Sequence, residues 1–248
     1  MEWYFSGLAG HALPLLCVLL ASLLQSLTGF GLAIATAPLL MFFYDAKEVV
    51  SIVLLLCVCG NFVQGLMQLR RAHLSLVAFL YLGVLLGQPV GLLLYHAASS
   101  DMLKLAINLM VLFSLIVMRM LHVRLRISRG NSVKAGVLAG ITSVTTGMGG
   151  PPFLLYIAHT KMAPEVLRAT CFVFFFLCNI TSLSAHALGG YAIGTAFREF
   201  LYLLPGLVLG VLLGNLLYDH VPKTWIRQAI FVLLVTASLI GCADVLLG

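Results

Sequence analysis

Charged side chains are scarce in this sequence. Lys, Arg, Asp and Glu together make up 9% of the 248 residues, against about 25% in soluble domains. Hydrophobic residues make up 62%, and the mean hydropathy is +1.11. A soluble fold of this length cannot bury so much apolar surface, whereas lipid can solvate it. The composition excludes an ordinary soluble protein and predicts an all-α polytopic membrane protein.

Long polar stretches are missing as well, so residues 1–248 are predicted to form a single membrane domain. The net charge of +6 does not indicate a nucleic-acid partner. Its basic residues are sparse and stand between apolar runs, which is typical of cytoplasmic loops. The expected surroundings are the lipid bilayer of a plasma membrane, the inner membrane in a Gram-negative host.

Motifs for catalysis and for nucleotide binding are also absent. Without a nucleotide-binding motif, a self-contained ATP-driven pump is excluded. An intramembrane enzyme needs a nucleophile–base pair or a metal motif such as His-Glu-x-x-His, and none is found; Asp219 and His220 adjoin only at the end of a segment. The six cysteines all lie inside apolar runs, so we predict no metal and no cofactor.

Acidic residues are missing from the middle of every apolar run. Proton coupling through a buried carboxylate is therefore not supported. His159 and His186 are the nearest titratable candidates. The sequence favours interfacial or packed positions for both and leaves open whether either takes part in proton coupling.

The apolar runs divide the chain into eight segments. A helix that spans the membrane needs about 20 apolar residues. The segments cover residues 8–43, 49–69, 74–96, 102–121, 133–158, 165–188, 199–218 and 224–247. The first is too long for one helix and is interrupted at residues 28–31, and the fifth is interrupted by Gly-Met-Gly-Gly-Pro-Pro at 147–152. Helices do not run smoothly through such residues. Both segments therefore predict two half-helices joined at a break.

The two halves of the chain repeat one another. Gly29, Gly31 and Asn61 match Gly147, Gly149 and Asn179 at an offset of 118 residues. Ala46, Glu48 and Val49 match Ala163, Glu165 and Val166 at 117, and a ladder of Gly83, Gly87 and Gly91 matches Gly206, Gly210 and Gly214 at 123. We infer a duplication of roughly 1–121 onto 130–248, joined by a basic cytoplasmic loop at 122–132. The glycine ladders are interpreted as packing positions.

The basic residues indicate the topology. If all eight segments cross the membrane with the N-terminus inside, 8 of the 14 Lys and Arg residues are cytoplasmic. If the two broken segments are re-entrant and the N-terminus is outside, only Lys47, Lys104 and Arg198 remain outside. The positive-inside rule favours the second arrangement. Each half is then a broken re-entrant helix pair plus three transmembrane helices, and the halves are inverted repeats.

The breaks are the strongest functional signal. Half-helix N-termini present free N–H groups and a positive dipole end, which suit an anion. Two breaks in inverted repeats are expected to meet near the membrane midplane. Polar side chains nearby can complete the site: Gln25 and Thr28 in the first half, and Ser143, Thr145 and Thr146 in the second.

Three more polar residues are candidates for this site. Asn61 and Asn179 either cap backbone groups exposed by the breaks or contact substrate. Arg168 is either an anchor at the cytoplasmic surface or a guanidinium at the inner mouth of the anion path.

The sequences LLQSLTGFGLAIATAPLL and AGITSVTTGMGGPPFLLY resemble the two breaks of the TauE/SafE (sulfite exporter) family of membrane transporters, and the resemblance covers essentially the whole chain. It implies transport of a small anion such as sulfite, thiosulfate, sulfoacetate or a carboxylate. The break positions that it implies for the site are Gly29, Phe30, Gly31, Gly147, Gly149, Gly150 and Pro151.

The leading hypothesis is a secondary transporter, an exporter of a small sulfur-containing anion bound between the breaks. A transporter of a small carboxylate or another anion on the same fold is the alternative, and an intramembrane enzyme is the hypothesis from another class. A cation channel is disfavoured because the break dipoles favour anions. The sequence leaves open which anion is carried, the coupling ion, the direction, and whether copies associate into a homo-oligomer.

The topology predicts the location of the C-terminus. A phosphatase that is active only after export should work when fused there, because the re-entrant arrangement places this end outside. A fluorescent protein that folds only in the cytoplasm should stay dim at the same position. A bright fluorescent fusion with a silent phosphatase would contradict the re-entrant arrangement.

Overall fold

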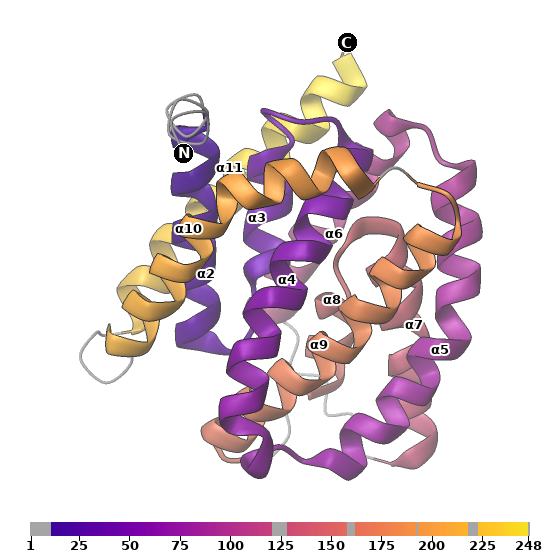
Figure 1. Cartoon of the computed structure of the whole chain (residues 1–248), viewed down its shortest axis with the longest axis vertical. Helices are drawn as coiled ribbons and strands as arrows, with labels where there is room; N and C mark the ends of the chain where they lie inside the picture. Colours follow the sequence, from indigo (N-terminus) through magenta and orange to yellow (C-terminus); the bar gives the residue numbers. More distant parts are fainter. Residues whose placement is uncertain (1–10, 121–127, 158–161, 192, 218–222, 248) are drawn as a thin grey trace.

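The computed structural model describes residues 11–120, 128–157, 162–191, 193–217 and 223–247. In these residues the fold is all-helical (Figure 1). The first half contains α2 (Ala12–Thr28), α3 (Leu32–Leu40), α4 (Ala46–Gln68), a short 3-10 helix η1 (Leu69–Arg71), α5 (Leu74–Ala97) and α6 (Ser100–Met120). The second half contains α7 (Arg129–Thr146), α8 (Gly150–Ile157), α9 (Pro164–Leu188), α10 (Ile193–Leu217) and α11 (Lys223–Leu247).

The predicted segments and both breaks are found close to their expected positions. Two helices begin earlier than expected: α10 begins at Ile193 and not at residue 199, and α7 begins at Arg129, within the segment expected to be loop. Ser128 caps it by accepting a hydrogen bond from the Asn131 N–H at 3.2 Å. Ser and Asp are preferred at this position because their side-chain oxygen satisfies a free N–H of the first turn; Asp45 caps α4 in the same way.

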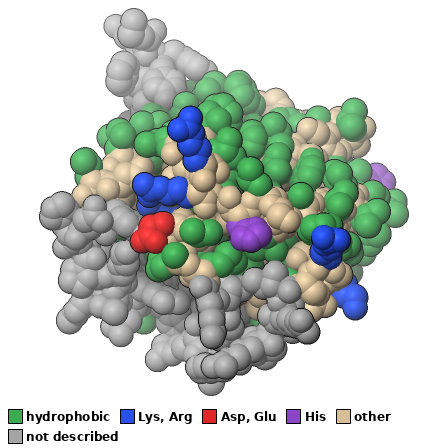
Figure 2. Space-filling model, turned by 90° about the horizontal axis from the view of Figure 1, so that it is seen from below, with side chains coloured by type: hydrophobic (Ala, Val, Ile, Leu, Met, Phe, Trp, Pro, Cys, Tyr) green, Lys and Arg blue, Asp and Glu red, His purple; other side chains and the backbone are tan. Residues whose placement is uncertain are grey.

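Among the described residues, four helices are long and apolar enough to cross a membrane: α4 continued through η1, α5, α9 and α10. Leu86 and Leu93 on α5, and Leu212 and Leu216 on α10, are exposed on the outside of the bundle. Such surfaces are stable against lipid and costly in water. Figure 2 views the lower end of the molecule, where separate Lys and Arg side chains stand among hydrophobic ones.

The two broken segments form hairpins (Figure 1). In that view α2 runs downward and α3 returns upward, whereas α7 runs upward and α8 returns downward. The start of α7 and the end of α8 meet where the Ser128 N–H donates to the Tyr156 hydroxyl at 3.2 Å. The two hairpins thus open toward opposite ends of the bundle, and α2 begins at the same end where α11 finishes.

Each hairpin is held by the other half of the chain. On α5, a Cβ added at Gly83 or Gly87 would collide with the backbone carbonyls of Val133 and Val137 on α7. On α10, a Cβ added at Gly206 would lie 2.6 Å from the Leu15 carbonyl oxygen on α2. The glycine ladders therefore let helix backbones touch, which confirms the packing interpretation.

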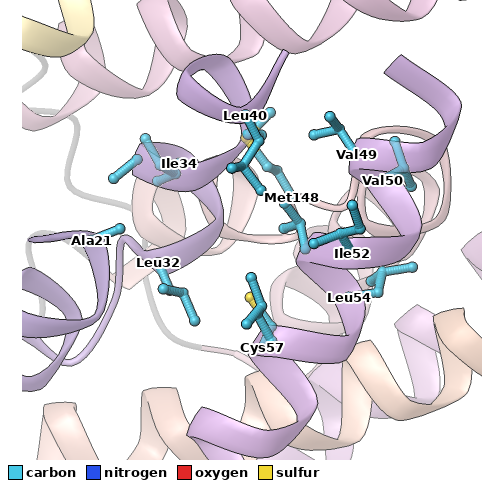
Figure 3. Close-up of a cluster of buried hydrophobic side chains, with 14 of the residues drawn as sticks. Ala21, Leu32, Ile34, Leu40, Val49, Val50, Ile52, Leu54, Cys57 and Met148 are labelled. Atoms are coloured by element: carbon cyan, nitrogen blue, oxygen red, sulfur yellow. The ribbon is translucent and has the colours of Figure 1, made fainter. Parts of the chain in front are cut away.

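The core lies around α3 and α4 (Figure 3). Leu32 and Leu40 of α3 are fully buried, and Met148 from the second break inserts between α3 and the Val49–Ile52 turn of α4. The short helix α3 is thus enclosed by protein. That enclosure is required because a helix of nine residues cannot span a bilayer or leave its ends in lipid.

A buried carboxylate ties the upper end of the first hairpin to α10. Glu199 accepts a hydrogen bond from the His11 ring at 2.8 Å, and the His11 ring stacks on Tyr202 at 4.7 Å. Burial, and then the Glu199 carboxylate, raise the pKa of the nearby Tyr44 hydroxyl above its usual range. Both ends of the α2–α3 hairpin therefore meet at Glu199.

The backbone contact at Gly83 predicts a stability effect. Gly83→Ala should lower the unfolding temperature and the yield, because forcing a methyl into such a contact costs about 1–3 kcal/mol. Gly194→Ala is the matched control, since nothing lies within 4 Å of a Cβ there. Thermal unfolding in detergent measures both, and a Gly83→Ala protein as stable as wild type would contradict direct α5–α7 contact.

Candidate functional site

The first break uses two glycines in the left-handed region. After α2 ends at Thr28, Gly29 has φ +87° and its N–H donates to the Gln25 carbonyl at 2.7 Å. Gly31 has φ +112° and precedes the first residue of α3. Side chains other than glycine rarely adopt these angles. The Thr28 hydroxyl donates to the Phe30 carbonyl at 2.6 Å, so it stabilises the turn itself.

The second break has one glycine in the left-handed region, where the first break has two. Gly147 has φ +73° and its N–H donates to the Ser143 carbonyl at 2.9 Å. Gly149 does not adopt a positive φ. Pro151 and Pro152 then occupy the first turn of α8, where a missing N–H removes no helical hydrogen bond. The same prolines leave α8 with fewer free N–H donors than α3 has.

A small cavity lies where the two breaks meet. Its volume of about 20 Å³ has room for about one water molecule. The lining contains eight of the site residues predicted from the sequence: Gln25, Phe30, Gly31, Asn61, Gly147, Gly149, Gly150 and Asn179. None of the described lining residues carries a charge. Residues of the two breaks, which are 118 positions apart in sequence, thus line the same cavity.

Paired polar side chains flank the cavity in each half. The Gln25 amide donates to Asn61 Oδ1 at 2.6 Å, and the Ser143 hydroxyl donates to Asn179 Oδ1 at 3.4 Å. Both pairs join residues 36 apart in sequence. These pairs use the oxygen of each asparagine and leave its NH₂ group, a hydrogen-bond donor, outside the pair. Gln25 Oε1 is buried and has no partner within the described part of the chain.

Six other predicted site residues do not line this cavity: Thr28, Gly29, Thr145, Thr146, Pro151 and Arg168. The Thr145 hydroxyl donates to the Gly91 carbonyl at 3.1 Å and to the Ile141 carbonyl at 2.8 Å, so it joins α7 to α5. Thr146 donates to the Thr142 carbonyl of its own helix at 2.8 Å. These hydroxyls serve the framework of the break.

Arg168 lies beside the first break although it belongs to the second half. A Cβ on Gly29 would lie 2.9 Å from Arg168 Cγ, so the arginine stem packs directly on the left-handed turn. Its guanidinium donates to Asn215 Oδ1 of α10 at 2.8 Å and stands 5.4 Å from the centre of the Phe172 ring. Arg168 thus connects α9, α10 and the first break.

Sequence reasoning missed five lining residues: Leu32, Ala33, Ile34, Cys57 and Phe175. Cys57 precedes Asn61, and Phe175 precedes Asn179, by four residues. Residues four apart share a helix face, so this periodicity could have identified both. The three α3 residues supply the first free N–H groups of that helix, since first-turn N–H groups have no partner within their own helix.

A family model described as "Sulfite exporter TauE/SafE" matches residues 14–240. The chain belongs to the TauE/SafE family. The match covers both breaks, the cavity and all four candidate spans. It confirms the resemblance carried by the two break sequences, and TauE/SafE proteins are membrane transporters. No curated protein matches the chain, and no solved structure matches it.

The Thr145 hydrogen bonds predict that Thr145→Ala loses stability rather than anion affinity. Losing a bond between α7 and α5 should cost about 1 kcal/mol. Thr142→Ala is the control, because Thr142 is bonded only within its own helix. Thermal unfolding and sulfite calorimetry on both variants measure the two effects. A tenfold loss of sulfite affinity at unchanged stability would instead assign Thr145 to the site.

Proposed function

We propose that this TauE/SafE protein is a secondary transporter that exports a small sulfur-containing anion, such as sulfite or an organosulfonate. The anion binds in the cavity between the Thr28–Gly31 and Thr145–Gly150 breaks. The observation that carries this proposal is that two helix breaks converge on one cavity whose described lining is neutral and includes the first three residues of α3, whose N–H groups have no partner within their own helix. A site of this kind offers partial positive charge without a fixed cation.

The donors are expected to come mainly from the first break. Leu32, Ala33 and Ile34 present first-turn N–H groups of α3, while Gly149 and Gly150 contribute the backbone of the second break. An oxyanion is costly to dehydrate, so several donors must replace its water. A sulfonate or sulfite, with three oxygens around one sulfur, can use donors from both breaks together. A small carboxylate is the alternative substrate.

The inverted-repeat hypothesis is supported by matching backbone contacts. The carbonyls of Val133, Val137 and Ile141 on α7 face Gly83, Gly87 and Gly91, and those of Leu15, Leu19 and Leu23 on α2 face Gly206, Gly210 and Gly214. The second set of glycines follows the first by 123 residues, and the α7 carbonyls follow the α2 carbonyls by 118. These are the offsets of the sequence repeat. Two hairpins that open to opposite ends suit alternating access.

The proposed orientation places the lower end of Figure 1 in the cytoplasm of a plasma-membrane protein. Arg70 and Arg71 in η1 and Arg129 at the start of α7 belong to this end. Basic side chains near helix ends are retained on the cytoplasmic side. The basic residues visible in Figure 2 support this assignment.

In this conformation the cavity is too small for an oxyanion, since it holds about one water molecule. Binding therefore requires the hairpins to separate slightly. The left-handed glycines at 29, 31 and 147 are suited to such a movement, because glycine changes its backbone angles at little cost.

Gly150→Ala tests the site. A Cβ there would lie 3.5 Å from Ile34 Cδ1 and 3.9 Å from Phe175 Cζ, both in the cavity lining and at ordinary contact distance. The protein should fold normally, while the methyl group occupies the space of the anion. We expect sulfite affinity, measured by calorimetry on purified protein, to fall at least tenfold, or about 1.4 kcal/mol. Gly194→Ala is the control.

Gly149 is a poorer test position, since a Cβ there would lie 3.2 Å from the Ala139 carbonyl oxygen and from Cys178 Sγ. A substitution would then disturb packing as well as binding. If Gly150→Ala binds sulfite, thiosulfate and sulfoacetate as wild type does, the site is elsewhere and the breaks serve only packing or movement.

A further inference from the structure

Three buried polar residues form a stripe along α9. Asn179, Ser182 and His186 are spaced three and four residues apart, which places them on one helix face. All three are buried, and His186 is completely so. Asn179 lines the anion cavity, and His186 lies seven residues farther along, or about 10 Å at 1.5 Å per residue. The stripe leads from the cavity toward the upper end of the bundle.

Hydrogen bonds connect the lower part of this stripe. The Ser143 hydroxyl lies 3.4 Å from Asn179 Oδ1 and 2.9 Å from the Ser182 hydroxyl. The Gln88 amide donates to the Ser182 hydroxyl at 3.0 Å and to the Cys178 carbonyl at 3.2 Å. Side chains from α5, α7 and α9 are thus linked into one network between the cavity and the turn below His186.

At the upper end of the stripe, one ring nitrogen of His186 has no hydrogen-bond partner among the described residues. Its Nε2 lies 2.8 Å from the Val144 carbonyl oxygen. A carbonyl only accepts hydrogen bonds, so Nε2 carries the proton and Nδ1 is an unprotonated acceptor in the neutral ring. Nδ1 is buried and has no hydrogen-bond partner within the residues that the structure describes. An unpaired buried acceptor is costly, but burial also disfavours the charged imidazolium. Proton binding at Nδ1 therefore requires a negative charge nearby.

Titratable groups surround the His186 ring on the upper side. The Tyr95 ring of α5 lies 4.3 Å away and the Tyr191 ring, just after α9, lies 5.5 Å away. The Tyr191 hydroxyl is 2.8 Å from Nδ1 of the exposed His96. Tyr95 donates to the Lys47 carbonyl at 3.3 Å, near Asp45, and α7 presents the Val144 carbonyl. His186 is thus in ring contact with two tyrosines on the side of the upper surface, and it lies one helical turn from the hydrogen-bond network that reaches the cavity.

We propose that His186 is a proton-binding residue coupled to the anion site, and that its Nδ1 takes up a proton when the cavity binds an anion. The inference rests on the proposed function. The step is a proton transfer: an N–H bond forms at Nδ1, and the proton comes from hydronium or a buffer acid in solution, which becomes water or the buffer base. The Nε2–H group keeps its hydrogen bond to the Val144 carbonyl. At about 10 Å and an effective dielectric constant of about 20, one negative charge raises the proton affinity of the ring about tenfold. A dianion and one proton would then move with a net charge of −1.

Proton counting tests this proposal. Thiosulfate and sulfoacetate are suitable probes because their own charge is constant from about pH 6 to about pH 8, where histidine titrates. Calorimetry in buffers of different ionisation enthalpy gives the number of protons taken up per anion bound. Wild type should take up at most about half a proton per anion, near the pH at which the ring titrates, because a tenfold change in proton affinity allows no more. His186→Gln, whose amide can still donate to Val144, should bind the anion with no proton uptake. Ser184→Ala, exposed on the same helix, should behave as wild type.

Binding without proton uptake in wild type would overturn the coupling but not the anion site. Undiminished uptake in His186→Gln would assign the proton to another group and overturn the proposal as well. If neither probe binds to wild type, the anion proposal fails for this class, and the coupling fails with it. Nuclear magnetic resonance of nitrogen-labelled histidine in the wild-type protein gives an answer that does not depend on the variant folding. At a given pH in the range where histidine titrates, it should show a larger imidazolium fraction at His186 with anion bound than without it. A ring whose charge state does not change when the anion binds would overturn the proposal.

Discussion

The structure depends on satisfying backbone polar groups where two helices are interrupted inside an apolar fold. Each unsatisfied N–H or C=O in hydrocarbon costs several kcal/mol. The carbonyl side of each break is closed locally, by the bonds from Gly29 to Gln25 and from Gly147 to Ser143. The N–H side is left open toward the cavity, at the start of α3. The proposed anion site depends on this asymmetry, because free N–H groups suit an electron-rich ligand. Residues of α4, α9 and the opposite break line the same cavity.

Close helix contact is what permits that enclosure. The hairpin helices α2 and α7 are each held by the opposite half of the chain, where the ladders beginning at Gly206 and Gly83 bring the helix backbones together. Inserted side chains would push the hairpins outward and open the cavity to lipid. Met148 reinforces the arrangement because it inserts from the second break into the core of the first half. The same helix contacts therefore hold the bundle together and position both breaks.

The parts predicted from the sequence are those set by local chemistry. Apolar runs between charges indicate the helices, and Gly-Phe-Gly and Gly-Met-Gly-Gly-Pro-Pro indicate the breaks, because these residues decide backbone angles by themselves. Hydrogen bonds between side chains and residues of other helices could not be predicted in the same way. Thr145 is bonded to Gly91, 54 residues away in sequence, and Arg168 to Asn215, 47 residues away. No local sequence pattern indicates such pairs. Cys57 and Phe175 were overlooked because, in the sequence alone, a hydrophobic residue that lines a cavity cannot be distinguished from one that packs in the core.

A neutral site also avoids an energetic cost that a carrier of a small ion would otherwise incur when its site is empty. During one part of its cycle the site must exist empty, and a buried fixed cation without its anion would cost several kcal/mol. N–H groups carry only partial charges, and the cavity seen here has the volume of about one water molecule, which can satisfy such donors when no anion is bound. The same weak, distributed charge lets a bound anion leave. On this argument the lack of a cation in the described lining, with Arg168 bonded to Asn215, suits the proposed role of a transporter that releases the anion it binds.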